Sequence, residues 1–136
     1  MDDRLYIRDK GGDIKFYFDT NKGVIRQDNW QAPSLKNSWV NYSNSWNKAG
    51  FFKDRQGIVH LKGLVKGGNP NSSSSKLSTI FQLPAGYRPL TRELMLVITN
   101  NYQVARVDIY SNGNVIANRY SNGWLSLDGV SFRAHR

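Results

Sequence analysis

The sequence predicts an all-β protein, an antiparallel, jelly-roll-like sandwich or barrel of roughly ten short strands. Aromatic residues make up 12% of the 136 residues, and twelve glycines accompany many Asn and Ser residues. Strong helix formers are scarce, since Glu93 is the single glutamate. Apolar and polar residues alternate in short runs that end at turn residues, which is typical of strands. With 39% apolar residues, the chain can close one main core.

Residues 1–36 are expected to form a short N-terminal β neck or linker, and residues 37–136 the main β-barrel domain. In the neck, short apolar runs at residues 5–7, 14–18 and 24–25 predict three strands. Glycine-containing turns at 11–12 and 21–23 separate them. This unit is small for an independent core, so we expect it to pack on a neighbouring subunit or lead into the main domain.

Residues 28–48 are polar and aromatic and predict a loop-rich connection with one strand near 39–42. Trp30, Trp39 and Trp46 all lie in it. Their side chains either cover the hydrophobic core or present the flat faces of their rings to a ligand. In the second case Tyr42 and Trp46, among several asparagines, suit the binding of sugar rings.

Residues 50–68 predict a β-hairpin around the polar turn 53–57, whose Gly57 can adopt positive φ. The returning strand is expected to run without a break from residue 58 to 65. Its core face carries Val59, Leu61 and Val65, and its other face is mixed. Taken together with the family-like order of motifs given below, its apolar face favours a scaffold role for this hairpin, with a subunit contact through Ile58 and Leu64.

The second half of the chain predicts a series of antiparallel strands. After a flexible polar loop at 67–76, strands are expected at 77–83 and 93–99. The strand at 93–99 is apolar on both faces, so it should be central and covered on both sides. Residues 102–110 alternate cleanly and lead into Asn112-Gly113, a strong hairpin signal.

The tetrapeptide Tyr-Ser-Asn-Gly occurs at 110–113 and again at 120–123, which predicts a meander. The last run, 124–134, alternates around Asp128-Gly129, either a bulge or a turn.

The sequence predicts no enzyme, no catalytic residue, no metal site and no cofactor. It has no cysteine, and His60 and His135 stand in no metal-binding or nucleophile motif. No glycine-rich phosphate loop is complete. The carboxylates that could converge in space, as glycoside hydrolysis requires, belong to no motif, and turn or ion-pair roles suit them better. These are Asp54, Glu93, Asp108 and Asp128.

Charge and hydropathy bear on the partners of the chain. The net charge of +9 favours a polyanionic partner, although single, scattered Lys and Arg residues also suit a solvated surface. No apolar run is long enough to span a bilayer, so no membrane partner is expected.

The remaining chemistry is a binding surface of aromatic, amide and basic side chains. Sugar C–H faces stack on aromatic rings while Asn, Asp and Arg bind hydroxyls, and Arg or Lys binds phosphate. The same inventory could bind single-stranded nucleic acid by stacking. The candidate ligand-binding residues are Tyr42, Trp46, Tyr102, Arg106, Asp108, Tyr110 and Arg119.

The order of several motifs carries a family resemblance. The succession is WNKAGFFKDRQGIVHLKGLVKGG, then IFQLPAGYRP, then N-G-x-V, then GWLSLDGVSFRA. It resembles the receptor-binding head domains of tail-tip and baseplate proteins from phages of Gram-positive bacteria, over about residues 37–134.

The resemblance implies a compact β head, a homotrimer joined to an upstream tail or baseplate protein, located in the virion. Its ligand would be a host cell-wall saccharide, polysaccharide or teichoic acid, rather than nucleic acid. The alternatives are a structural trimerisation domain without receptor binding and a carbohydrate-binding module of a wall-degrading enzyme.

Overall fold

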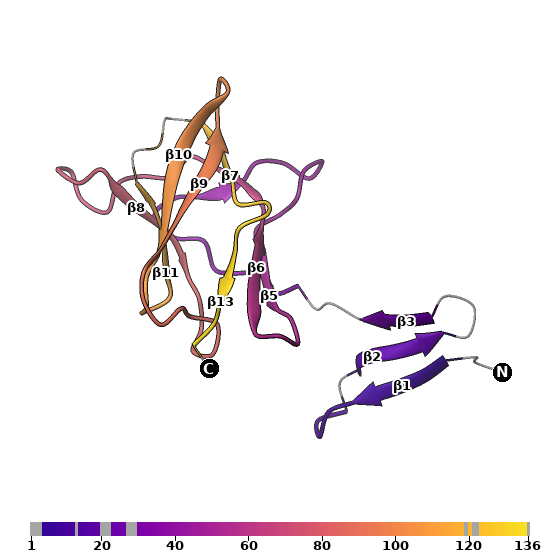
Figure 1. Ribbon diagram of the computed structural model, residues 1–136. Coiled ribbons are helices and arrows are strands. Elements are labelled where there is room, and N and C mark those ends of the chain that lie inside the picture. Colours follow the sequence, from indigo (N-terminus) through magenta and orange to yellow (C-terminus); the bar gives the residue numbers. More distant parts are fainter. Residues whose placement is uncertain are drawn as a thin grey trace.

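The computed structural model describes residues 4–12, 14–19, 23–26, 30–118, 120 and 123–135. Strands β1 to β13 form three antiparallel sheets in these ranges, and no helix occurs there (Figure 1). The described ranges contain no helix that could span a membrane. The all-β, antiparallel fold class predicted from the sequence is confirmed.

The N-terminal strands form a sheet of their own, in the order β1-β2-β3. They are β1 (Arg4–Arg8), β2 (Ile14–Asp19) and β3 (Gly23–Arg26). All three predicted strands are therefore present, while residues 21–22 of the second predicted turn lie outside the described residues. The assignment of residues 1–36 as a neck stays a prediction.

The largest sheet has seven strands in the order β4-β7-β12-β9-β10-β11-β8. Their bounds are β4 (Val40–Asn41), β7 (Leu64–Lys66), β8 (Leu77–Gln82), β9 (Glu93–Thr99), β10 (Gln103–Ile109), β11 (Asn114–Asn118) and β12 (Trp124–Ser126). The third sheet has the order β13-β6-β5. Its strands are β5 (Gly50–Lys53), β6 (Ile58–Lys62) and β13 (Ser131–Arg133).

The main core includes apolar side chains of both of these sheets. Phe51, Val59, Leu61 and Phe132 come from the three-stranded sheet, and Val65, Phe81, Val97, Val107, Val115 and Leu125 from the seven-stranded sheet. Trp39 is also buried in this core. Its indole N–H has a hydrogen-bond partner there, since Nε1 donates to Ser78 Oγ over 2.8 Å. We call the core side of the large sheet its inner face and the opposite side its outer face.

Gly63 divides the returning arm of the hairpin that the sequence predicts at 50–68. β5 and β6 pair as expected, and Gly57 has a φ of 85°. Gly63, with a φ of 128°, then redirects the chain, so that β7 joins the other sheet. The prediction of one continuous strand from 58 to 65 is therefore wrong. Leu64 is 9% exposed in the single chain, and the subunit contact through Ile58 and Leu64 stays a prediction.

β9 is central in the large sheet, as predicted, but one of its faces lacks the expected cover. Val97 and Thr99 are buried on the inner face. Leu94, Leu96 and Ile98 point outward and are between 58% and 76% exposed. The prediction of a strand covered on both sides is thus wrong for the single chain.

The C-terminal strands follow the predicted meander only in part. β9, β10 and β11 are consecutive neighbours, with Gly113 at a φ of 92° in the second turn. β12 does not continue beside β11, because it pairs with β7 and β9. Residues 121–122 of the second Tyr-Ser-Asn-Gly lie outside the described residues. Asp128-Gly129 forms a turn that carries the chain from β12 to β13 in the other sheet.

Candidate functional site

An aromatic cleft lies on the outer face of the large sheet, near the β4 edge. It has a volume of about 300 Å³ and is lined by Tyr42, Trp46, Leu64, Ile98, Trp124, Ser126 and Asp128. This volume is at the lower end of the range of ligand sites, roughly 300 to 1,000 Å³. The cleft therefore combines three aromatic rings with a carboxylate in a space of ligand size.

The loop that carries Tyr42 and Trp46 is tied at both ends to the backbone of Leu64. The Tyr42 N–H donates to the Leu64 carbonyl over 2.8 Å, and the Leu64 N–H donates to the Asn47 carbonyl over 2.9 Å. Trp46 between them stays 60% exposed. Because the loop is anchored before any ligand arrives, binding does not have to order it.

Trp124 reaches the cleft because of the register of β12. It lies opposite Lys66 on β7, and Lys66 in turn lies opposite Val40 on β4. Residues directly opposite one another share a face of the sheet, so all three point outward. The Trp124 backbone is fixed on both sides, since its N–H donates to Asn100 Oδ1 and its carbonyl accepts from Thr99 Oγ1, each over 2.6 Å.

Asp128 supplies the acidic group of the aromatic cleft. Its Oδ1 accepts from the backbone N–H of Gly63 at 2.8 Å and from Asn47 Nδ2 at 3.3 Å. Both of these bonds use the same oxygen, and no described residue donates to Oδ2. One oxygen therefore holds the turn in place while the other can accept hydrogen bonds from a ligand.

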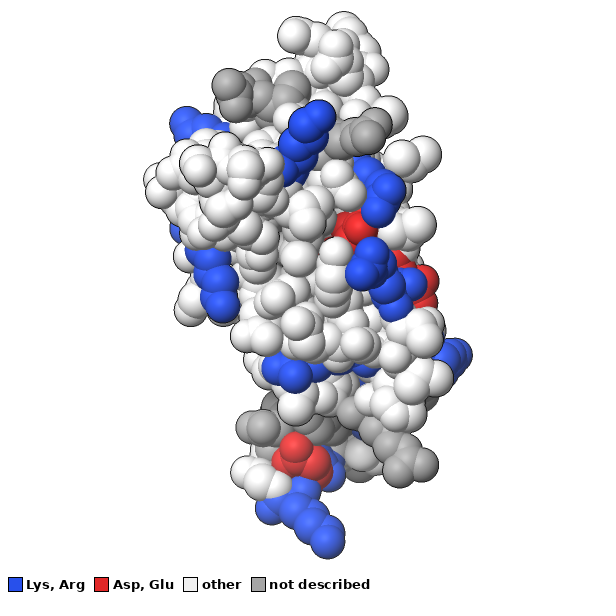
Figure 2. Space-filling model, turned by 90° about the vertical axis from the view of Figure 1, so that its left-hand side faces the viewer, with Lys and Arg blue, Asp and Glu red and all other residues white. Residues whose placement is uncertain are grey.

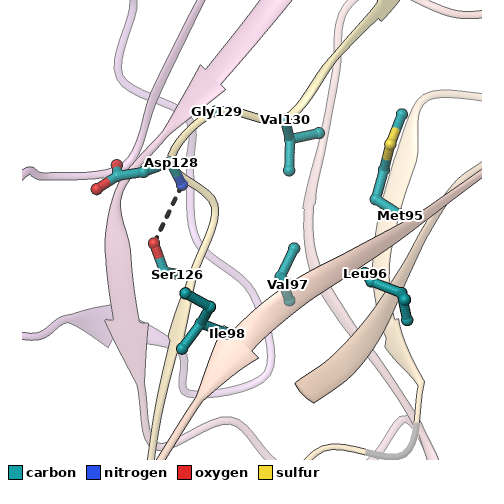
Figure 3. A pocket seen from close by; sticks show the side chains of 8 residues that line it. All are labelled: Met95, Leu96, Val97, Ile98, Ser126, Asp128, Gly129 and Val130. Carbon is teal, nitrogen blue, oxygen red and sulfur yellow. Dashed lines mark hydrogen bonds between the residues drawn. The ribbon is translucent and has the colours of Figure 1, made fainter. Parts of the chain in front are cut away.

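A second, aliphatic cleft of about 270 Å³ adjoins the first and shares Ile98, Ser126 and Asp128 with it (Figure 3). β12 pairs with β9 through Leu125 and Thr99. Beyond this pair the chain moves away from β9 toward Val130, and the cleft lies in the resulting gap. Figure 3 shows Val97 and Val130 pointing toward each other and the Asp128 carboxylate pointing away from them. Polar ligand groups are therefore better placed in the aromatic cleft.

The structure brings together two of the seven predicted binding residues, Tyr42 and Trp46, in the aromatic cleft. Arg106 and Asp108 pair with each other through two hydrogen bonds of 2.8 Å, and the Asp108 side chain is 1% exposed. The Arg92 guanidinium carbon lies 4.0 Å from the ring centroid of Tyr110.

Tyr102 stands fully exposed at the turn between β9 and β10, outside the lining of either cleft. Arg119 lies outside the described residues. The saccharide roles assigned to these residues from the sequence remain predictions.

Sequence reasoning missed Trp124 and Asp128 as members of one site with Tyr42. The motif Gly-Trp-Leu-Ser-Leu-Asp contains the signal, because Trp124, Ser126 and Asp128 are spaced by two. That spacing places Trp124 and Ser126 on one face of β12. Their proximity to Tyr42 follows from the pairing β4-β7-β12, which the sequence does not specify.

Positive charge is distributed over the surface rather than gathered at this cleft. On the face shown in Figure 2, Lys and Arg side chains are spread out rather than gathered in one patch, and several of them lie next to Asp or Glu side chains. Beside the cleft, Lys66 Nζ lies 5.1 Å from the ring centroid of Tyr42. The described residues contain no cluster of three or more side chains that could hold a metal ion.

The fold is similar to that of a crystallised phage protein. The chain matches the crystal structure of the receptor binding protein (gp15) of Listeria phage PSA with a TM-score of 0.63 and 16% sequence identity. The match covers 78% of this chain and 64% of that protein, so the chain spans less than two thirds of its length. No family model and no curated protein sequence matches the chain.

Proposed function

We propose that this chain is a receptor-binding domain of a phage tail, which attaches the virion to a saccharide of the host cell wall. The observation that carries the proposal is the aromatic cleft, which Tyr42, Trp46 and Trp124 line together with the carboxylate of Asp128. The fold shared with a phage receptor binding protein supports it. The proposal includes a homotrimer that joins an upstream tail or baseplate protein and multiplies weak sites by avidity.

The charges at the aromatic cleft favour a hydroxyl-rich, uncharged sugar ring inside it. Oδ2 of Asp128 accepts hydrogen bonds from hydroxyls and repels phosphate. The ring's C–H face stacks on an aromatic side chain, of which Trp46 is the most exposed. For a wall polymer such as teichoic acid, the phosphate would lie outside the cleft, on the side of Lys66.

The cleft supports binding rather than hydrolysis. Glycoside hydrolysis requires two carboxyl groups on either side of the scissile bond. Among the described residues lining the cleft, Asp128 alone carries a carboxyl group. We therefore propose a non-enzymatic domain, and we expect no soluble sugar to be released from walls incubated with it.

The experiment measures binding to purified cell walls from a panel of Gram-positive strains, with and without teichoic acid. Trp46→Ala should lower the affinity about tenfold, the equivalent of 1.4 kcal/mol. Trp30→Ala is the matched control, because Trp30 is also exposed, at 41%, but does not line the cleft. Thermal unfolding of each variant checks that the fold is intact.

Unchanged binding by Trp46→Ala, or an equal loss in Trp30→Ala, would contradict the assignment of the cleft. The dependence of the affinity on salt then distinguishes a neutral sugar from a phosphate-bearing ligand. A neutral ring predicts little change in affinity with ionic strength, whereas contacts led by phosphate predict a steep decrease.

A further inference from the structure

The aliphatic cleft offers binding groups that a sugar ring held in the aromatic cleft does not use. Its most buried side chains are apolar, since Val97 and Val130 are each 6% exposed and point toward each other (Figure 3). Polar groups lie where the two clefts meet, because Ser126 and Asp128 line both of them. The aliphatic cleft is thus an apolar pocket that joins the aromatic cleft at a hydroxyl and a carboxylate.

Ser126 supplies a hydrogen-bond donor at this junction. Its Oγ accepts from the backbone N–H of Asp128 over 3.2 Å, which holds the oxygen in place. Among the described residues, none accepts a hydrogen bond from the Ser126 hydroxyl. The hydroxyl can therefore donate to a ligand carbonyl, while Oδ2 of Asp128 accepts from a ligand N–H or O–H.

The edge of β9 adds backbone groups of the same kind. β9 pairs with β10 along its whole length but with β12 only at Thr99. In the described part of the chain, residues 95–98 therefore have no strand partner on the side of the aliphatic cleft. Alternate residues of an antiparallel strand direct both their N–H and their C=O to one side. This edge thus presents a peptide donor and a peptide acceptor to the cleft.

We propose that the aliphatic cleft binds the acetamido group of an N-acetylated amino sugar whose ring lies in the aromatic cleft. This inference rests on the proposed function, since it places a substituent relative to the bound ring. The N–H next to the ring donates to Asp128 Oδ2, and the carbonyl accepts from the Ser126 hydroxyl. The methyl group packs against Val97 and Val130, on the side away from the Asp128 carboxylate (Figure 3).

Other sugar substituents fit this pocket less well. A hydroxyl group placed against Val97 and Val130 would lose water without gaining a hydrogen-bond partner. A deoxy methyl group would cover the Ser126 hydroxyl and leave it unsatisfied. A free amine could pair with Asp128, but it has no apolar group to fill the pocket. The acetamido group is uncharged and combines a donor, an acceptor and a methyl, so it matches all of these surroundings.

The test compares methyl glycosides of N-acetylglucosamine, N-acetylgalactosamine and N-acetylmannosamine with those of glucose, galactose and mannose. Each acetamido sugar thus has a control that lacks only the acetamido group. Titrations of the isotope-labelled protein, followed by NMR, measure each dissociation constant. At least one acetamido sugar should bind roughly tenfold tighter than its parent hexose, because it adds a buried methyl and hydrogen bonds. The amide signals of Val97 and Val130 should shift with that sugar and not with the hexose.

Ser126→Ala tests the polar part of the pocket. It removes the hydroxyl donor and should lower the ratio of acetamido to hexose affinity about threefold or more. Ser131→Ala is the matched control, because Ser131 also lies on a strand but lines neither cleft. The ratio isolates the acetamido group, since a general change in the fold alters both affinities. Thermal unfolding verifies that both variants are folded.

Equal affinities for acetamido sugars and hexoses, or no binding of any of these sugars, would overturn the inference. An unchanged ratio in Ser126→Ala, or an equal fall in Ser131→Ala, would overturn it too. The proposed function is judged separately, by cell-wall binding and its loss in Trp46→Ala. Walls bound through Trp46 together with equal sugar affinities would keep the proposed function and reject the acetamido group alone.

Discussion

The carboxylate of Asp128 accepts a hydrogen bond from the backbone N–H of Gly63, 2.8 Å away. Gly63 is the residue at which the chain passes from the three-stranded to the seven-stranded sheet. Beside this bond, the Leu127 N–H donates to the Gly63 carbonyl over 2.7 Å. The acidic group of the cleft is thus positioned by the crossover between the two sheets.

Substitutions of Asp128 should separate its structural role from its binding role. Asp128→Ala removes the acceptor for Gly63 and should lower the free energy of unfolding by about 1 to 2 kcal/mol. Asp128→Asn keeps an oxygen for Gly63 and should stay within about 0.5 kcal/mol of the wild type. Its affinity for cell walls should still fall severalfold, because charge-assisted hydrogen bonds are roughly twice as strong as neutral ones. Urea denaturation and wall binding measure the two effects, and equal affinity of Asp128→Asn and wild type would argue against a ligand role.

Gly63→Ala should be one of the most destabilising small substitutions in the chain. An added Cβ would lie 2.5 Å from Ala49 Cα, and the φ of 128° is unfavourable for any other residue. We expect a loss of about 3 kcal/mol or more in the free energy of unfolding. Gly129→Ala is the control, since it has a φ of 83° with open space around it and should cost about 1 kcal/mol. Similar losses in both variants, measured by denaturation, would show that the contact with Ala49 is relieved cheaply.

Tyr102→Gly should stabilise the hairpin of β9 and β10. Asn101 and Tyr102 have φ values of 59° and 60°, as in the turns that favour Asn-Gly. A tyrosine in this conformation is strained, and its exposed ring has no described apolar contact to lose. The expected gain is about 0.5 to 1 kcal/mol in the free energy of unfolding. A lower melting temperature for Tyr102→Gly would indicate that the ring stabilises the fold.

Asp54 should make stability depend on pH below about pH 4. Its Oδ2 lies 2.9 Å from His60 Nε2, and its Oδ1 accepts from the N–H groups of Gln56 and Ile58, each at 2.9 Å. The hydrogen bond with His60, and then those from the backbone, hold the pKa of Asp54 below its usual value of 3.8. Because the folded state lowers this pKa, the stabilisation is complete above pH 3.8 and is lost as the pH falls through the folded value.

Asp54→Asn tests this dependence. The difference in unfolding free energy between wild type and variant should shrink from about pH 5 to about pH 2.5 in urea titrations. A difference that stays constant over this range would contradict the assignment.

The strands could be predicted from the sequence because alternation and turn residues are local signals. The hairpin at Asn112-Gly113 and the alternation over 103–109 are examples. The break at Gly63 was not predictable in this way. A glycine between Lys62 and Leu64 preserves the period of two, and its close neighbours at the break, Ala49 and Asp128, are distant in sequence.

Only some of the residues that line the candidate site could be predicted from the sequence. Tyr42 and Trp46 stand out within one polar, aromatic segment, so composition identifies them. Trp124 and Asp128 join them through the non-sequential order β4-β7-β12, which depends on long-range pairing. Similarly, the apolar outer side of β9 was predicted to be covered, and the sequence does not say whether the cover comes from the same chain.

The double tie of the 42–47 loop to Leu64 has a consequence for the evolution of the protein. The ties use backbone atoms of Tyr42, Asn47 and Leu64, so they do not depend on the identity of residues 43–46. Mutations there can change the chemistry presented to a ligand without disturbing β7 or the core beneath it. The loop is therefore a segment where ligand specificity, under the proposed function, can diversify at low cost to folding.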